Sequence, residues 1–188
     1  MNIFHQLQLL NYNQLGHRSI SLLNLTKFYQ INPKTIVEVG VWKGKHARLL
    51  RYLFPDADLF LVDPWKPYSS KGFPPEKASQ RVTFENAYRE TQNIFKKDPK
   101  TTIIRQPSLK ACSFFSRDID IVFIDGDHQY SAVKSDIKAW KSKVRSGGLL
   151  AGHDYNPNKF HGVVKAVNES LRKKFIVLGD SVWATIIS

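Results

Sequence analysis

Apolar positions along the chain alternate between two spacings, which predicts strands separated by helices. Short β-branched and apolar runs typical of buried strands occur at Thr35–Val39, Leu59–Val62, Thr101–Arg105, Ile119–Ile124, Leu149–Ala151, Phe175–Leu178 and Val182–Ile187. Segments with helical spacing occur at about Gly44–Phe54, Arg81–Lys97, Leu109–Phe115, Ser131–Val144 and His161–Lys173. This order predicts an α/β domain in which strands and helices follow one another.

The connections between the strands predict their directions. Strands that are joined through a helix pair in parallel with a right-handed crossover. The last two strands are joined by Gly179-Asp180-Ser181 alone. A connection this short cannot cross over, so these strands must be antiparallel. We therefore expect a mostly parallel sheet with an antiparallel last strand.

The segment before the first strand predicts an N-terminal helical region. Residues 1–33 carry apolar side chains at near-helical spacing from Leu7 to Tyr29, and Asn32-Pro33 closes the segment. We expect one or two helices that pack on a sheet edge. Because no shift in composition divides the 188 residues, the chain predicts a single domain, 1–188.

One long connection interrupts the alternation. Residues 64–80 are rich in Pro, Gly and Ser and contain Trp65, Tyr68 and Phe73. A loop of this length in a compact domain is usually either a functional lid or disordered. Its aromatic residues favour a lid.

The net charge and the cysteine content indicate which ligands and which cellular compartment to expect. The formal net charge of +12 favours acidic substrates, nucleic acid or anionic surfaces, although the basic residues are scattered over predicted helices, where solvated helix faces explain most of them. The single cysteine, Cys112, excludes an internal disulfide framework and indicates a reducing, cytoplasmic compartment. No basic leader with an apolar core and no run of about 18 apolar residues occurs, so no export signal or membrane span is expected.

The turn after the first strand is the first candidate binding site. Gly40 and Gly44 bracket it, and a helix follows at once. Glycine lets backbone approach a ligand closely, and helix N-termini suit phosphate-bearing or nucleotide-like ligands. Glycines in turns also occur for purely structural reasons, so the turn alone is weak evidence.

Acidic residues at strand ends are the second candidate site. Glu38, Asp63, Asp125 and Asp154 fall at or just beyond the carboxyl ends of predicted strands, where open α/β sheets bind ligands. The alternative is structural, because Asp125 and Asp127 could cap the following helix and Asp154 could organise a turn.

Four segments carry a resemblance to a known family. VEVGVWKGKHARLL, LVDPW, VFIDGDHQYSAVKSDIKAW and SGGLLAGHDY resemble class I S-adenosylmethionine-dependent methyltransferases, and specifically the group with macrocin-type O-methyltransferases and cephalosporin hydroxylase-like proteins. The resemblance covers about Thr35 to Ser188. It implies a three-layer, doubly wound α/β fold whose seven-stranded, mostly parallel sheet has the order 3-2-1-4-5-7-6 and an antiparallel last strand.

The resemblance also implies a set of S-adenosylmethionine-binding residues. It places this role on Glu38, Gly40, Trp42, Gly44, Asp63, Pro64, Trp65, Ser108 and Asp125. Asp63 matches the carboxylate that accepts hydrogen bonds from the ribose hydroxyls. Two positions depart from the family pattern: Trp42 stands where many members have glycine, and Pro107 where relatives often carry an acidic residue near the adenine amino group.

The same resemblance brings the fourth and fifth strands together and points to a metal. Asp125 and Asp127 then approach His153 and Asp154. Converging carboxylates repel unless they are protonated or bridged by a cation, so we expect Mg²⁺ with Asp125 and Asp154 as ligands. For the catalytic base, Asp125, Asp127, His128 and His153 all stay open.

The expected function is methyl transfer from S-adenosylmethionine to a hydroxyl of a small molecule, such as a sugar or polyketide-like acceptor, with assistance from Mg²⁺. One alternative is a nucleic-acid (RNA) methyltransferase that uses the basic surface. Against it, Asp125-Gly126-Asp127-His128 stands where amino-directed enzymes carry Asn-Pro-Pro-Tyr or Asp-Pro-Pro-Tyr. The other alternative is a binding module that keeps the fold without turnover.

Overall fold

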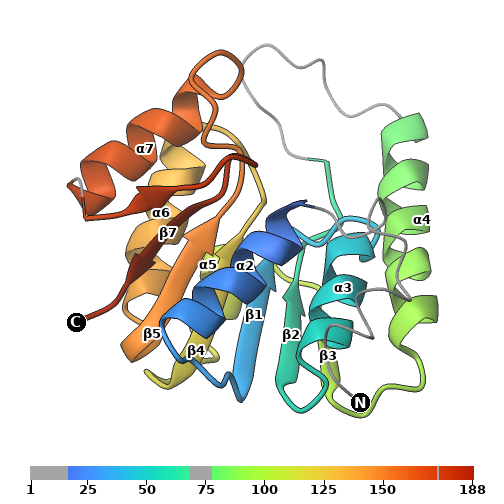
Figure 1. Cartoon of the computed structure of the whole chain (residues 1–188). Helices are drawn as coiled ribbons and strands as arrows, with labels where there is room; N and C mark the ends of the chain where they lie inside the picture. The colour runs from blue at the N-terminus through green and yellow to red at the C-terminus, as the bar shows by residue number, and fades with distance from the viewer. Residues whose placement is uncertain (1–16, 68–77, 173) are drawn as a thin grey trace.

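The computed structural model describes residues 17–67, 78–172 and 174–188 (Figure 1). One sheet of seven strands has the order β3-β2-β1-β4-β5-β7-β6. The strands are β1 (Thr35–Val39), β2 (Asp58–Val62), β3 (Thr101–Ile104), β4 (Ile119–Ile124), β5 (Val144–Gly152), β6 (Ile176–Val177) and β7 (Trp183–Ile186). The first five pair in parallel, and β7 pairs antiparallel with both β5 and β6. The predicted fold class is confirmed.

Helices cover both faces of the sheet. They are α2 (His17–Phe28), α3 (Lys45–Leu53), α4 (Ala78–Phe95), α5 (Ser108–Cys112), α6 (Tyr130–Lys141) and α7 (His161–Leu171). Figure 1 shows α2 and α3 in front of the sheet and α5 and α6 behind it. Each face has its own apolar cluster: Ile36 of β1 points to the first, with Leu22 and Leu50, and Val37 to the second, with Trp140. This alternation is the period of two that a strand buried on both faces produces.

Two predictions about the elements are wrong. The N-terminal helix α2 packs on the sheet face instead of its edge, because Leu22 and Leu25 are buried in the same cluster as Phe123 of β4. The Ser146-Gly147-Gly148 segment, which separates the predicted helix Ser131–Val144 from the predicted strand Leu149–Ala151, lies inside β5, while α6 ends at Lys141. Gly147 has a φ of +73°, and the register of β5 against β4 shifts here, so the glycines form an irregularity within a strand.

Two predictions lie partly outside the described residues. Of the N-terminal segment 1–33, residues 1–16 are not described, and of the lid 64–80, residues 68–77 are not described. In the described part of the chain, no helix is long and apolar enough to cross a bilayer.

Hydrogen bonds tie three loops together at the carboxyl edge of the sheet. The Gly40 N–H donates to the Val62 carbonyl at 2.9 Å, and the Asp125 N–H donates to the Val39 carbonyl at 2.7 Å. The His153 N–H donates to the Ile124 carbonyl at 3.0 Å. The loops after β1, β4 and β5 therefore leave the sheet side by side.

Candidate functional site

A cavity of about 750 Å³ opens beyond the carboxyl ends of β1, β2 and β4. Its lining includes Gly40 and Trp42 from the turn after β1, Asp63 and Pro64 after β2, Phe84 of α4, Ser108 of α5, Asp125, Asp127 and His128 after β4, and Asp136 of α6. A volume of this size suits a nucleoside-sized ligand. The position is where open α/β sheets bind ligands.

The turn after β1 requires glycine at two positions. Gly40 has a φ of +89°, and a Cβ there would lie 2.2 Å from the carbonyl oxygen of Asp125. Gly44 has a φ of +70° and precedes α3. Because Gly40 has no side chain, the β1 turn and the β4 loop touch through their backbones, and both face the cavity.

Asp63 holds this turn in place. Its Oδ2 accepts hydrogen bonds from the Val41 and Trp42 N–H groups at 3.0 and 2.9 Å, and its Oδ1 accepts from the Trp65 N–H at 2.6 Å. Burial raises the pKa of Asp63, an effect that these three N–H groups partly offset. A carboxylate offers about four acceptor positions. The bonds to the backbone therefore leave about one position of Asp63 for a ligand in the cavity.

The two tryptophans of the site have different positions. Trp42 is 40% exposed, lines the cavity, and meets the ring of Phe84 edge-on at 5.0 Å between centroids. Trp65 is buried against Tyr88, and its Nε1–H donates to the Trp42 carbonyl at 2.7 Å. Pro64 lines the cavity, whereas Trp65 supports the Trp42 backbone from beneath.

Ser108 bonds to an aspartate that was not among the predicted site residues. The Ser108 hydroxyl donates to Oδ1 of Asp136 at 2.6 Å and accepts from Nε1–H of Trp140 at 2.8 Å. Asp136 is 7% exposed, and burial raises its pKa to about 6. The available signal was a charged residue on the apolar face of a helix, between Val133 and Ile137.

Glu38 lies behind the cavity wall. Its Oε1 is 3.0 Å from Nδ1 of His46 on α3, and both side chains are buried. Burial raises the pKa of Glu38 in spite of the histidine. Within the described residues, Oε2 of Glu38 and Nε2 of His46 have no hydrogen-bond partner. Neither residue lines the cavity, so Glu38 belongs to the support of the site.

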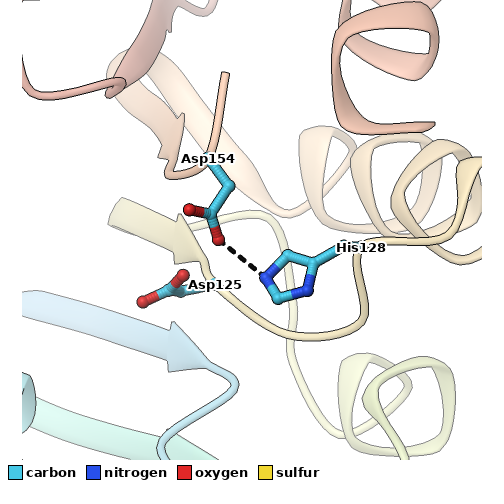
Figure 2. Close-up of side chains that lie close together, drawn as sticks. All are labelled: Asp125, His128 and Asp154. Atoms are coloured by element: carbon cyan, nitrogen blue, oxygen red, sulfur yellow. Dashed lines mark ion pairs between the residues drawn. The ribbon is translucent and has the colours of Figure 1, made fainter. Parts of the chain in front are cut away.

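A cluster of carboxylates and imidazoles forms where β4 and β5 end, and Figure 2 shows three of its members, Asp125, His128 and Asp154. His128 Nε2 lies 2.7 Å from Oδ2 of Asp154, and His153 Nδ1 lies 3.0 Å from Oδ1 of the same aspartate. His153 Nδ1 is also 3.6 Å from Oδ1 of Asp125. The predicted approach of Asp125 to His153 and Asp154 is therefore present in the structure.

The histidines and Asp154 shift one another's pKa values. The hydrogen bond with Asp154 raises the pKa of His128 above its ordinary value. Burial opposes protonation of His153, yet its bonds to Asp125 and Asp154 raise its pKa to about 9. Burial would raise the pKa of Asp154, but the two histidines hold it well below its usual range. At neutral pH the cluster thus keeps Asp154 ionised against a cationic His153.

Asp127 and Asp125 behave differently. Oδ1 of Asp127 accepts a hydrogen bond from the Gln129 N–H at 2.9 Å, just before α6. This contact is of the structural kind that the sequence offered as the alternative to catalysis. Asp125 instead forms an ion pair with Arg18 of α2. Sequence reasoning missed Arg18, because 107 positions separate the two residues and no local pattern connects them.

The donor atoms of the cluster could meet at one cation. One atom each from Asp125, His128 and Asp154 lie within 4.8 Å of one another. The two carboxylates are ligands of the kind that Mg²⁺ or Mn²⁺ prefers, whereas an imidazole is more usual on softer divalent metals. The carboxylates of the donor set therefore suit the expected metal better than the imidazole does, and Arg18 already binds one Asp125 oxygen.

Known proteins resemble this chain in sequence and in fold. A family model described as a methyltransferase domain matches residues 37–155. An uncharacterized protein of Acanthamoeba polyphaga mimivirus, R132, is 28% identical over 149 residues, which are 79% of this chain and 64% of that protein. The chain thus spans less than two thirds of the length of this relative.

Three solved structures share the fold. The O-methyltransferase NovP matches with a TM-score of 0.65 and 16% identity, over 93% of this chain and 80% of NovP. A putative caffeoyl-CoA O-methyltransferase from Staphylococcus aureus matches at 0.62 and 16%, over 91% and 83%. The Podospora anserina methyltransferase PaMTH1, bound to SAH, matches at 0.60 and 13%, over 91% and 78%. Because the matched family region spans more than half of the sequence and contains both the glycine turn and the Asp125 cluster, the chain belongs to the methyltransferase domain family.

Proposed function

We propose that this protein is an S-adenosylmethionine-dependent methyltransferase that methylates a hydroxyl oxygen of a small molecule. One observation carries the proposal: the glycine turn and Asp63 line the same cavity as Asp125 and His128. A single ligand space therefore joins a nucleoside-type site to a cluster able to accept a proton. NovP and the Staphylococcus aureus protein, which share the fold, are described as O-methyltransferases.

The cofactor would occupy the part of the cavity nearer β1 and β2. We place its methionine portion against the turn from Gly40 to Gly44, where backbone can approach closely. The free acceptor position of Asp63 would bind a ribose hydroxyl. Pro64 and Ser108 line the same space and would contact the adenine. Trp42 and Phe84, at the cavity wall, would exclude water from the bound cofactor.

For this reaction the protein mainly has to align the acceptor oxygen with the sulfonium methyl and remove the hydroxyl proton. The acceptor oxygen attacks the sulfonium methyl, a C–O bond forms as the C–S bond breaks, and the hydroxyl proton leaves. Alignment of oxygen, carbon and sulfur supplies a large share of the rate. A base must then stand at the acceptor end of the cavity.

His128 is the base that we propose. It lines the cavity, and its Nε2 is held by Asp154, which leaves Nδ1 to take the acceptor proton. The raised pKa of His128 makes it a stronger base than a free imidazole. His153, with a pKa of about 9, instead neutralises Asp154, because its Nδ1 lies 3.0 Å from Asp154 and 3.6 Å from Asp125. Asp127 is occupied by the turn before α6.

The metal prediction belongs to the same residues. Asp125, His128 and Asp154 would hold a divalent cation such as Mg²⁺. A bound cation would lower the pKa of the acceptor hydroxyl, whereas a free His128 would accept the hydroxyl proton. The cation and the free imidazole are thus alternative ways to activate one hydroxyl.

We also propose that the chain falls within the macrocin-type group and takes a sugar or polyketide-like acceptor. The segments that carry this resemblance, FIDGDHQY and GGLLAGHDY, supply the whole cluster in Figure 2. The net charge of +12 would attract an acceptor that carries acidic groups.

Isothermal titration with S-adenosylhomocysteine tests the cofactor site. We expect binding to the full chain and its loss in Asp63→Ala, with Gly179→Ala as a control in which the new methyl group has nothing within 4 Å among the described residues. Incubation with labelled S-adenosylmethionine and a panel of hydroxylated compounds then tests turnover. Absence of cofactor binding at millimolar concentration would sink the proposal. Binding without turnover on any acceptor would favour a non-catalytic module.

The nucleic-acid alternative has its own measurement. Several arginines are engaged in ion pairs, such as Arg51 with Asp98 and Arg105 with Glu85, so these side chains are less free to bind phosphate groups, although the net charge of +12 already counts their acidic partners. A salt-dependent shift of labelled RNA at physiological ionic strength would support this alternative over a small acceptor.

A further inference from the structure

The ion pair between Arg18 and Asp125 joins the N-terminal helix to the proposed acceptor end of the cavity. Arg18 lies in the first turn of α2, and its guanidinium binds Oδ2 of Asp125 at the end of β4. The two side chains are 33% and 13% exposed. The same Asp125 is one of the three donors that could meet at a cation.

Arg18 is delivered to this position by a packed helix. Leu22 is fully buried against the sheet, and Leu25 is buried beside it. The Ser21 hydroxyl donates to Oδ2 of Asp180, in the hairpin between β6 and β7, at 2.9 Å. These contacts hold the helix against the sheet one to two turns after Arg18, so the ion pair is a defined feature of the fold.

A guanidinium and a divalent cation compete for the same carboxylate. Oδ2 of Asp125 is already bound by Arg18, and its Oδ1 faces His153 at 3.6 Å. A cation that used Asp125 would lie beside a permanent positive charge in a partly buried site, where repulsion is stronger than in water. Arginine cannot relieve this by losing a proton. Either Arg18 moves away, or the cation binds weakly.

We propose that Arg18 is the built-in cation of this site: it neutralises Asp125 in the absence of metal and determines how tightly a divalent metal binds. The proposal rests on the proposed function, because it takes the cluster as the place where the acceptor hydroxyl is activated. Arg18 thereby selects between the two modes of activation, by favouring a free His128 over a bound cation.

Metal binding at Asp125 would also affect helix α2. If metal displaces Arg18, the first turn of α2 loses one of its attachments to the sheet. Because coupling between two binding events is reciprocal, a change that breaks the contact of Arg18 with Asp125 should also strengthen metal binding. Amide hydrogen exchange in α2 beyond its first turn, where the N–H groups are hydrogen-bonded within the helix, should therefore accelerate when metal is added.

The test is Mn²⁺ binding to the full chain, followed by electron paramagnetic resonance of the free ion. Arg18→Gln removes the charge and keeps a polar side chain, and Arg18→Lys keeps the charge. Arg48→Gln, on an exposed position of α3, removes one positive charge elsewhere. Asp154→Asn removes one proposed ligand. Circular dichroism and S-adenosylhomocysteine binding show that each variant is folded.

We expect Arg18→Gln to bind Mn²⁺ at least about tenfold more tightly than the unmodified chain, since removal of a neighbouring like charge is worth at least that much. Arg18→Lys and Arg48→Gln should resemble the unmodified chain, and Arg18→Gln combined with Asp154→Asn should lose the gain. Equal affinity in Arg18→Gln and the unmodified chain would overturn the proposal. So would an equal gain in Arg48→Gln, which would mean a general charge effect.

Absence of Mn²⁺ binding in every variant, while S-adenosylhomocysteine still binds, would overturn the role of Arg18 and leave the cofactor site intact. Loss of both kinds of binding would overturn the proposed function as well. The two proposals therefore fail in distinguishable ways.

Discussion

Replacement of Gly40 by alanine tests the contact on which the cavity depends. The added Cβ would lie 2.2 Å from the Asp125 carbonyl oxygen, 2.4 Å from its carbonyl carbon and 2.5 Å from Cα of Gly126. All three atoms are backbone, so no side chain can rotate out of the way. The φ of +89° is also unfavourable for alanine. The turn after β1 and the loop after β4 must therefore separate.

Two costs determine the size of the effect. A left-handed backbone costs a residue with a Cβ about 1–2 kcal/mol, and overpacking costs about 1–3 kcal/mol. We expect Gly40→Ala to lower the free energy of unfolding by roughly 2–5 kcal/mol. In a domain of this size 1 kcal/mol shifts Tm by about 2–4 °C, so Tm should fall by at least about 4 °C. S-Adenosylhomocysteine binding should weaken with it, because both displaced loops line the cavity.

Thermal denaturation and isothermal titration of the same samples measure the two effects. Gly179→Ala is the matched control, because its new methyl group would have nothing within 4 Å among the described residues and it should stay within about 0.5 kcal/mol of the unmodified chain. Gly40→Ala with unchanged Tm and unchanged cofactor affinity would refute the reasoning, since the two loops would then not be in contact.

Three further predictions follow from single side chains. Asp136 binds its proton more tightly when folded, with a pKa of about 6 against about 3.9 unfolded, so its contribution to stability is complete below pH 4 and declines as pH rises to 6. The free energy of unfolding of Asp136→Asn, measured relative to the unmodified chain in urea titrations, should therefore rise by about 2 kcal/mol between pH 4 and pH 7. A difference between the two proteins that does not change with pH would contradict this. Asp63→Ala should lower the free energy of unfolding by about 2–4 kcal/mol, because three backbone N–H groups lose their acceptor. Asp63→Asn should lower it by less. Equal stability of the unmodified chain and both variants would argue against the role of Asp63. Cys112 is 4% exposed, and burial raises its thiol pKa, so a thiol reagent should react only as fast as the protein unfolds; immediate reaction of the native protein would count against this burial.

Local sequence rules identified most of the framework. The strand Ile119–Ile124 has the predicted bounds, because six apolar residues in succession suit a strand that is buried on both faces. The antiparallel pairing of β6 and β7 followed from a connection too short for a crossover. Prediction failed at Ser146-Gly147-Gly148, because the helical spacing of Ser131–Val144 continues past the end of α6 and the glycines form an irregularity inside β5.

Some residues of the candidate site were predicted from the sequence, and others were not. Asp125 and Asp154 were singled out by their places at strand ends, and the approach of Asp125 to His153 and Asp154 was expected from the strand order that the family resemblance implies. Arg18 and Asp136 were not found. Arg18 reaches Asp125 only through the packing of α2 on the sheet, and Asp136 reaches Ser108 only because α5 lies beside α6.

The sequence by itself determined the order of strands and helices, the antiparallel end of the sheet and the residues at the strand ends. These depend on spacing, turn length and side-chain type, which are local. The tertiary structure decided which partners the charged side chains have. Asp63 accepts hydrogen bonds mostly from backbone N–H groups, and Asp125 forms an ion pair with an arginine. Such partners are set by distances between elements far apart in the chain, and no local pattern encodes them.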